Sequence, residues 1–228
     1  MRTKLIGLLV LVASSLSFSY TYTNWTTMTG AKTIAVAPTI WGGAIDGLGS
    51  STLDLNTAFG FGDKVDVVLN LSKFEPLSDF TWAGIEVMPR YALTDNFVLA
   101  LKLGTDFEAL ELSPQIHLCK ELDKIVLELN AAIDLSTASD FKEGYIWASH
   151  GVVYKMIPDI FYPFIEFNPY VSYGYFETEV NFSIDPGFWF GVKDTPHQFS
   201  LSLPISGFKS GETISVGLNA WYWWSFEY

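Results

Sequence analysis

The sequence predicts an all-β fold in which about twelve antiparallel strands close into a transmembrane β-barrel. Three observations favour this fold class. Apolar and polar residues alternate along most of the chain, aromatic residues gather beside short turns, and short connections alternate with longer ones. Hydrophobic residues make up 49% of the 228 residues and aromatic residues 16%. No stretch after the first residues reaches the roughly 18 continuous apolar residues of a membrane helix, so the apolar residues must lie in strands.

The N-terminus has the order of a secretory signal peptide. Two basic residues, Arg2 and Lys4, precede an apolar run from Leu5 to Ala13, and small residues follow up to Ser19. Because that run is too short to cross a bilayer as a helix, we expect cleavage near Ser19 and no retained anchor. The sequence therefore divides into a signal peptide, a short N-terminal periplasmic segment and one transmembrane barrel, at residues 1–19, 20–30 and 31–228.

Twelve segments alternate with the period of two that is typical of strands, whose side chains point to opposite faces in turn. In one of them Leu99 and Leu101 share a face, while Ala100 and Lys102 share the other. Most segments have the length of about 9–11 residues that a tilted transmembrane strand needs. In chain order the expected strands span residues 31–41, 51–61, 64–72, 80–92, 96–104, 107–120, 124–134, 143–155, 160–175, 179–191, 198–206 and 212–228.

Some of these segments carry the pattern clearly and others do not. Residues 107–120 and 124–134 set leucine and isoleucine against charged and amide residues. Residues 179–191 and 212–228 set aromatic and branched residues against asparagine, serine and acids, whereas residues 143–155 have no clean parity. Proline removes a hydrogen bond from a strand ladder, so we expect bulges or kinks at the strand prolines. The strand count is therefore expected to lie between about ten and fourteen. These prolines are Pro38, Pro89, Pro114, Pro163, Pro169, Pro186 and Pro204.

The connections between the expected strands fall into two classes. Tight polar turns occur at residues 62–64, 94–96, 122–123, 157–159 and 193–196. Most of the links between them are longer, and they include residues 42–50, 73–79, 135–143 and 207–212. Short periplasmic turns and longer outside loops are typical of bacterial barrels. An even number of strands then predicts that both termini lie on the periplasmic side.

Aromatic residues cluster beside the short turns and in the final segment. Trp and Tyr favour the interface between membrane and water because their rings are apolar with a polar edge. A soluble β-sandwich has no reason to band its aromatic residues in this way. The predicted membrane-interface aromatics are Phe59, Phe61, Tyr91, Phe97, Tyr154, Phe161, Phe190, Phe199, Tyr222, Trp224, Phe226 and Tyr228.

With this final strand the chain resembles bacterial outer-membrane β-barrel proteins, the porin-like proteins, as a broad class. Their last strand alternates apolar residues up to a terminal aromatic, and this chain ends on Tyr228, where Phe or Trp is commoner in that class. The resemblance covers the whole mature chain as a pattern. It implies an integral protein of the outer membrane, with the lipid bilayer as a partner and the assembly machinery recognising the C-terminal strand. A homo-oligomer is compatible with it.

If the apolar face meets lipid, the polar face lines the lumen. Eight acids and two bases are among the expected lumen residues, and carboxylate-rich walls attract cations. The sequence therefore predicts a passive or weakly selective diffusion channel that favours cations or neutral solutes, against the alternative of a polar lumen with no selected permeant. The predicted lumen-lining residues with charged or imidazole side chains are Asp54, Asp66, Glu86, Arg90, Lys102, Glu111, His117, Glu128, Asp134, Glu166 and Asp185.

Turn geometry gives specific pairs within the lumen. A two-residue turn at Leu122 and Asp123 would pair His117 with Glu128 and Glu111 with Asp134. The second pair places like charges together, so it would be either a cation site or a solvated part of the wall. A three-residue turn near Asp95 would set Glu86 opposite Lys102 and form a salt bridge that braces the wall.

Other classes of function fit the sequence less well. Without residues 1–19 the chain keeps 11 basic and 25 acidic residues, a balance that argues against a nucleic-acid partner. Some outer-membrane barrels hydrolyse lipids with a Ser–His pair, but Ser149 and His150 are adjacent and leave opposite faces of a strand. No metal-binding or cofactor motif is present, so we predict neither an enzyme nor a cofactor. A structural or adhesive barrel and a soluble secreted sandwich are the remaining alternatives.

Overall fold

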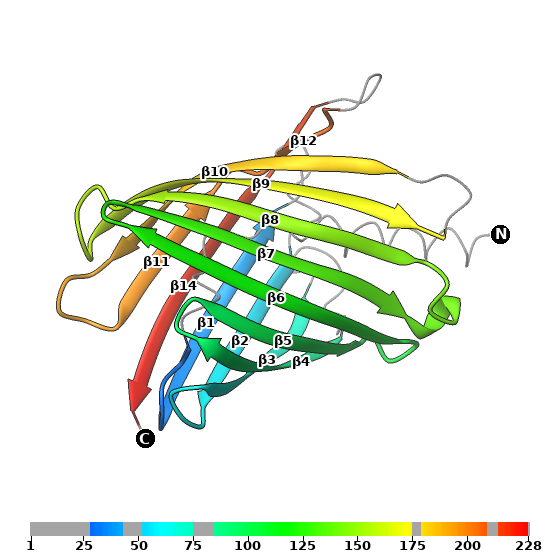
Figure 1. Ribbon diagram of the computed structural model, residues 1–228, viewed down its shortest axis with the longest axis horizontal. Coiled ribbons are helices and arrows are strands. Elements are labelled where there is room, and N and C mark those ends of the chain that lie inside the picture. Colours follow the sequence, from blue (N-terminus) through cyan, green and yellow to red (C-terminus); the bar gives the residue numbers. More distant parts are fainter. Residues whose placement is uncertain (1–27, 43–51, 75–83, 175–178, 209–213, 228) are drawn as a thin grey trace.

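The computed structural model describes residues 28–42, 52–74, 84–174, 179–208 and 214–227. Within these residues the chain forms one antiparallel sheet that closes on itself (Figure 1). Each strand pairs with its neighbour in sequence, and the last strand pairs back onto the first. Closure satisfies the backbone groups that an open sheet would expose at its edges. The structure therefore confirms the predicted all-β, closed antiparallel barrel.

Ten long strands come first in the chain. They are β1 (Thr33–Gly42), β2 (Thr52–Gly60), β3 (Val65–Phe74), β4 (Ile85–Thr94), β5 (Phe97–Thr105), β6 (Leu110–Leu122), β7 (Ile125–Ser136), β8 (Gly144–Tyr154), β9 (Phe161–Tyr173) and β10 (Val180–Gly191). Two interrupted strands complete the wall: β11 (His197–Ser202) continues into β12 (Ile205–Ser206), and β13 (Ser215–Val216) continues into β14 (Leu218–Glu227). Counted in this way, the described residues form the twelve strands that were expected.

The strand prolines do not produce the expected bulges. Pairing between β9 and β10 runs past Pro163, Pro169 and Pro186 without a shift of register. The two register shifts in the described pairings, in β2–β3 and β4–β5, do not fall on a proline. A proline lacks one N–H and so loses a bond to one neighbour only, which leaves the other neighbour to hold the register. Pro204 differs, because it lies in the interruption between β11 and β12.

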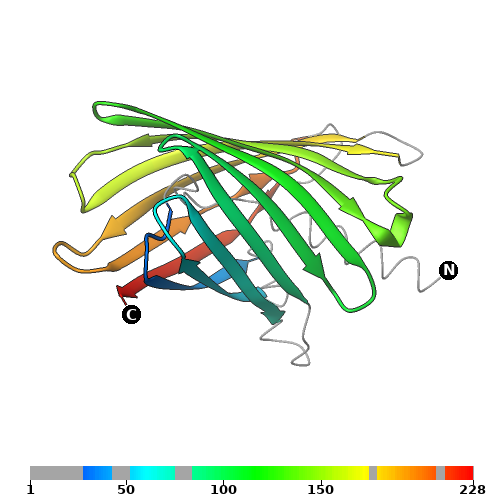
Figure 2. The ribbon, with the colours of Figure 1, turned by 60° about the horizontal axis from the view of Figure 1, so that its bottom comes forward.

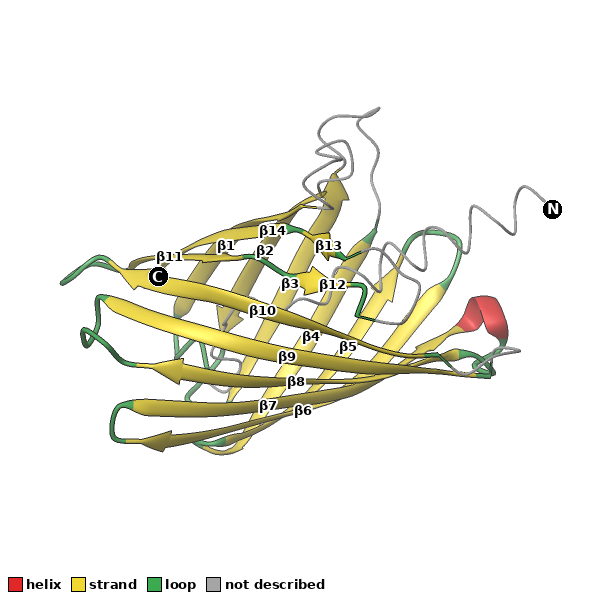
Figure 3. Cartoon of the chain, turned by 90° about the horizontal axis from the view of Figure 1, so that it is seen from above, coloured by secondary structure: helices red, strands yellow, loops and turns green. Residues whose placement is uncertain are grey.

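Short turns close one rim of the barrel and longer links close the other. β1 begins and β14 ends at the short-turn rim, where Thr33 pairs with Glu227. One longer link at the opposite rim holds the 3-10 helix η2 (Thr137–Ser139), drawn red in Figure 3. Both ends of the barrel sheet therefore lie at one rim, as an even strand number requires. That this rim faces the periplasm stays a prediction.

Side chains alternate between an exposed and a buried face along the wall. In β5, Val98, Ala100 and Lys102 are buried, whereas Leu99 and Leu101 are exposed. Because the described wall is a single sheet that curves around an interior (Figure 2), the buried face is the inner one. Within the described residues, no helix combines the length and the apolar character that crossing a membrane requires.

β8 explains why its segment showed no parity in the sequence. Its inward residues are Trp147, Ser149, Gly151 and Val153, which mix large, small, apolar and polar side chains. The outward residues include His150 among apolar ones. A period of two is present in the burial of the strand but absent from its hydrophobicity, because neither face has a uniform composition.

The register predicted for β6 and β7 is wrong by two residues. His117 pairs with Asn130 and not with Glu128, and Glu111 pairs with Ser136 and not with Asp134. The cause is the turn. Leu122 and Ile125 form the last pair, so Asp123 and Lys124 make the connection in place of Leu122 and Asp123. Asp123 accepts this position because it adopts a left-handed backbone with φ of 47°.

The register predicted for β4 and β5 is also wrong by two residues. Glu86 pairs with Gly104 and not with Lys102. The connection consists of Asp95 and Asn96, and an irregularity between Ala92 and Thr94 precedes it. A turn of a different length changes every partner along the strand, so the partner of Glu86 could not be placed without knowing this irregularity.

Candidate functional site in the barrel interior

The interior of the barrel holds many buried polar and charged side chains beside two clusters of buried apolar ones. Of the eleven predicted lumen-lining residues, Glu86, Glu111 and Asp134 are half-buried and the other eight are buried. Their burial reaches 0% exposure at Asp66, His117 and Asp185. The buried eight are Asp54, Asp66, Arg90, Lys102, His117, Glu128, Glu166 and Asp185. Polar groups inside and apolar groups outside are the reverse of the arrangement in a soluble barrel.

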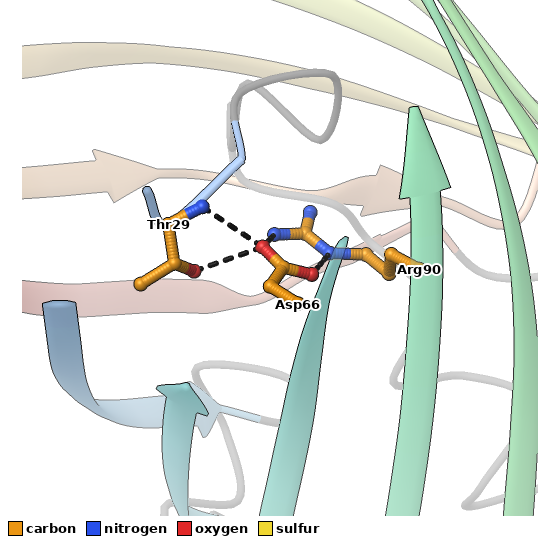
Figure 4. A network of polar contacts seen from close by, with 3 residues as sticks. All are labelled: Thr29, Asp66 and Arg90. Atoms are coloured by element: carbon orange, nitrogen blue, oxygen red, sulfur yellow. Dashed lines mark hydrogen bonds and ion pairs between the residues drawn. The ribbon is translucent and has the colours of Figure 1, made fainter. Parts of the chain in front are cut away.

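One ion pair joins β3 to β4 near the short-turn rim (Figure 4). Arg90 donates from Nε to Asp66 Oδ1 at 2.7 Å and from Nη2 to Asp66 Oδ2 at 2.5 Å. Thr29, which precedes β1, donates to Asp66 Oδ2 from both its backbone N–H and its hydroxyl, each at 2.9 Å. Sequence reasoning missed Thr29, because no local signal connects a residue before the first strand to a carboxylate in the third.

A backbone crossing brings Thr29 to this position. The backbone of Gly30 passes so close to Gly60 that a Cβ at Gly60 would lie 1.5 Å from the Gly30 oxygen. Gly30 has a φ of +85°, in the left-handed region that favours glycine. Lys32 N–H then donates to the Gly60 oxygen at 3.2 Å. The chain therefore reaches the interior carboxylate of Asp66 just before it enters β1.

The second ion pair inside the barrel joins β4 to β5. Lys102 Nζ lies 3.5 Å from Glu86 Oε1, and Asn70 donates to Glu86 Oε2 at 3.2 Å. The salt bridge predicted from the sequence is therefore present, although it runs diagonally between residues that are not directly opposite. The charge of Lys102 is also attracted electrostatically by the carboxylates of Glu111 and Asp134. Each of these acids thus has a base nearby, which argues against a separate cation site between them.

Asp134 and His117 have polar partners different from those predicted. Trp147 donates from Nε1 to Asp134 Oδ2 at 2.9 Å. His117 Nδ1 lies 2.8 Å from Asn130 Oδ1, in agreement with the register in which these two residues face each other. The described interior between β6 and β8 therefore holds one hydrogen bond between β6 and β7 and another between β7 and β8.

A row of acids runs across the inner wall from β7 to β10. Glu128 on β7 pairs with Gly151 on β8, which pairs with Glu166 on β9, which pairs with Asp185 on β10. Asn168 donates from Nδ2 to Asp185 Oδ2 at 3.1 Å. Glycine in the second position leaves no side chain between the two glutamates. The sequence indicated each acid as a lumen residue, but not the row, because Gly151 lies in the segment without parity.

Large apolar side chains are exposed along the outer face of the described wall. Leucine, isoleucine, valine and phenylalanine are exposed there, while the polar residues between them are buried. An exposed apolar surface of this extent marks contact with a lipid or protein environment. Its members on β5 to β9 include Leu99, Leu101, Leu103, Ile116, Leu127, Ile133, Val152, Ile165 and Phe167.

The predicted interface aromatics lie on this outer side of the wall near the short-turn rim. Phe161 packs on Phe190 with ring centroids 4.9 Å apart, and Phe199 packs on Tyr222 at the same distance. Tyr222 hydroxyl lies 2.5 Å from His197 Nδ1. Phe59, Phe97, Phe161 and Tyr222 are half-buried, and Tyr228 lies outside the described residues. The exposed ones are Phe61, Tyr91, Tyr154, Phe190, Phe199, Trp224 and Phe226.

The geometry offers no nucleophile–base pair at Ser149 and His150. Ser149 is buried in the interior, and His150 is exposed on the outside, where its ring stacks on Phe167 at 6.5 Å. A hydroxyl must lie within hydrogen-bond reach of an imidazole to be activated by it. Among the described residues, no three His, Cys, Asp or Glu side chains are grouped so that they could hold a metal ion.

Comparison with known proteins reveals a similar fold and no sequence family. No protein-family model matches the chain, and no curated protein matches it in sequence. The barrel is similar to the crystal structure of an outer membrane channel from Pseudomonas putida F1. The TM-score is 0.53 with 13% sequence identity, and the match covers 92% of this chain and 98% of that chain. At this identity, the likeness is one of fold.

Proposed function

We propose that the protein is an integral β-barrel of a bacterial outer membrane and conducts small solutes through its interior, with a preference for cations or neutral solutes over anions. One observation carries this proposal. Most large apolar side chains of the described wall are exposed, whereas charged side chains such as Asp66, Arg90 and Lys102 are buried. A sheet of this kind is stable when lipid covers the apolar face, because lipid removes that face from water. The fold shared with an outer membrane channel supports the same reading.

The charges of the interior support the preference for cations. The sequence assigns eight acids and two bases to the lumen, and the bases Arg90 and Lys102 are engaged with Asp66 and Glu86. The remaining acids lower the electrostatic potential along the interior, which attracts cations and repels anions. The burial of the interior side chains favours small permeants over bulky ones.

Export and assembly complete the proposal. The signal peptide over residues 1–19 would deliver the chain to the periplasm, and the short-turn rim with both chain ends would remain on that side. The C-terminal strand would be recognised by the outer-membrane assembly machinery, as the resemblance implies. The segment 20–30 would then be periplasmic, and Thr29, one of its described residues, contacts Asp66.

A structural barrel without transport is the second candidate. The observation that favours it is the complete burial of Asp66, His117 and Asp185, because a wide aqueous pore would expose the side chains of its wall. Such a barrel would act through its outer surface or its loops. It would insert into membranes and show no conductance.

Membrane fractionation and bilayer recording test the proposal together. The mature protein should sediment with outer membranes, resist extraction by salt and high pH, and migrate differently on gels before and after boiling. The purified protein in planar bilayers should then give discrete conductance steps. Release from membranes by salt alone contradicts membrane insertion. An inserted barrel that stays silent contradicts the channel and supports the structural candidate.

A further inference from the structure

We infer that Glu128 and Glu166, which flank Gly151 in the inner wall, form a subsite for a small cation. The inference rests on the proposed channel and specifies where a permeating cation would pause. The two glutamates occupy the same row of the sheet, with the glycine of β8 directly between them. Asp185 follows Glu166 in this row, so three acids lie on β7, β9 and β10.

Gly151 lets the two side chains approach each other. A Cβ built at Gly151 would lie 3.5 Å from Glu128 Cβ, 3.7 Å from Glu128 Oε2 and 3.8 Å from Glu166 Cγ. Both glutamate side chains therefore lean over the glycine from their own strands. A residue with a longer side chain at this position would fill the space between them.

Each glutamate of this pair has one buried carboxylate oxygen without a hydrogen-bond donor, as Asp134 has at Oδ1, but Asp134 and Asp185 each receive a donor on the second oxygen. Glu128 is 8% exposed and Glu166 is 3% exposed. Within the described part of the chain, no group donates a hydrogen bond to Glu128 Oε1 or Glu166 Oε2, and no base forms an ion pair with either residue. By contrast, Asp66 receives two bonds from Arg90.

Buried carboxylate oxygens without a partner are unfavourable, because they have lost water and gained nothing in exchange. Glu166 also feels the negative charges of Asp185 and Glu128. A cation between the glutamates would replace the lost hydration and offset the repulsion among the three acids. Buried unpartnered oxygens and mutual repulsion therefore point to the same occupant.

The geometry favours a transient occupant over a resident metal. In the described residues no three ligating side chains are grouped closely enough to hold a metal ion. A cation would thus be attracted by the combined charge and keep part of its own water, as in a pore where ions bind and leave. Divalent ions should bind more strongly than monovalent ones, because the attraction scales with their charge.

The experiment compares the full-length protein with the Glu128→Gln, Glu166→Gln and double variants. Glu108→Gln is the control, because Glu108 is exposed in the link between β5 and β6. Permeability for K⁺ relative to Cl⁻ comes from reversal potentials in planar bilayers under a KCl gradient. At a separation of about 8 Å and an effective dielectric constant of about 40, each removed charge should lower the attraction of K⁺ about fivefold and the repulsion of Cl⁻ about fivefold. The permeability ratio should therefore fall about 25-fold for each removed charge.

Binding of Mn²⁺ to the folded protein in detergent micelles, followed by electron paramagnetic resonance, gives a readout that needs no conductance. The wild type should bind Mn²⁺ and the double variant should lose that site, while heat-modifiable gel migration reports that both are folded. An unchanged permeability ratio together with unchanged Mn²⁺ binding in the double variant overturns the subsite. In another outcome the wild type gives no conductance in bilayers, while the double variant still loses the Mn²⁺ binding that the wild type shows. That result contradicts the proposed channel and supports the cation site.

A proton is the competing occupant of the same oxygens. Two neutral glutamic acids could remain buried without a cation, and their replacement by glutamine would then change neither readout. Unchanged values of both readouts would therefore contradict the subsite, because glutamine keeps the shape of the glutamate side chain and removes only its ionisable group.

Discussion

Replacing Arg90 with glutamine should destabilise the folded barrel by about 3 kcal/mol, near the lower end of the roughly 3–5 kcal/mol found when one partner of a buried ion pair is removed. Arg90 makes two hydrogen bonds to Asp66, of 2.7 and 2.5 Å, and the two side chains are 4% and 0% exposed. The substitution leaves Asp66 with the two donors of Thr29. Because those donors still satisfy part of the carboxylate, we expect the lower value.

Equilibrium unfolding of the protein in urea, refolded into thin phospholipid vesicles, measures this change through tryptophan fluorescence. Lys142→Gln is the matched control, because Lys142 pairs with Asp140 at the surface, where both side chains are mostly exposed. That variant should differ from the wild type by less than about 0.5 kcal/mol. An Arg90→Gln protein as stable as the control would refute the view that this pair holds β3, β4 and the entry to β1 together.

Four further substitutions test other parts of the barrel. Leu101→Arg places a charge on the outer apolar face and should cost about 2–4 kcal/mol in a bilayer, seen as a loss of the heat-modifiable form. Gly144→Ala should destabilise the barrel by at least about 1–3 kcal/mol, because its Cβ would lie 2.0 Å from a backbone oxygen. Gly151→Ala is its control: the added Cβ meets no atom closer than 3.5 Å, so this variant should unfold in urea like the wild type. Tyr222→Phe removes the hydroxyl that is hydrogen-bonded to His197 and should lower the free energy of unfolding in urea by about 1 kcal/mol. An unchanged free energy of unfolding would mean that this hydrogen bond stabilises the barrel no more than a hydrogen bond to water does.

Which residues face inward could be predicted where one face is uniformly apolar. In β5, leucines alternate with Lys102 and small residues, so the period of two is visible in the sequence and in the burial. In β8 the inward face holds Trp147, Ser149 and Gly151, and no hydrophobicity pattern can show a period that the composition does not carry. The alignment of the acids in one row across Gly151 therefore could not be predicted, although each acid of the row was predicted to face the lumen.

Which residues face each other depends on the turns, and the pairings predicted for β4–β5 and β6–β7 were wrong. Asp123 in a left-handed conformation moved the turn between β6 and β7 by one position, which changed the partner of His117 from Glu128 to Asn130. The Lys102–Glu86 bridge nevertheless forms, because a lysine side chain is long enough to reach a diagonal neighbour. Long side chains tolerate an error of two residues in register, whereas short ones such as Asn130 do not.

The contact of Thr29 with Asp66 shows a third limit. It depends on Gly30 and Gly60 passing each other at a distance that no side chain allows, and these glycines are far apart in the sequence. Neither glycine stands in a pattern that would connect them. Contacts between the chain entry and the interior follow from the closure of the barrel, which is a property of all strands together.

The reversal potential of the purified wild-type protein in a planar bilayer, under a tenfold gradient of KCl, decides whether the barrel is a cation-preferring channel. We predict discrete conductance steps and a reversal potential of the sign that K⁺ permeation produces, because acids outnumber bases among the predicted lumen residues. A reversal potential of the opposite sign would contradict the acidic lumen. The absence of any conductance from a protein shown to be folded and inserted would contradict the channel itself.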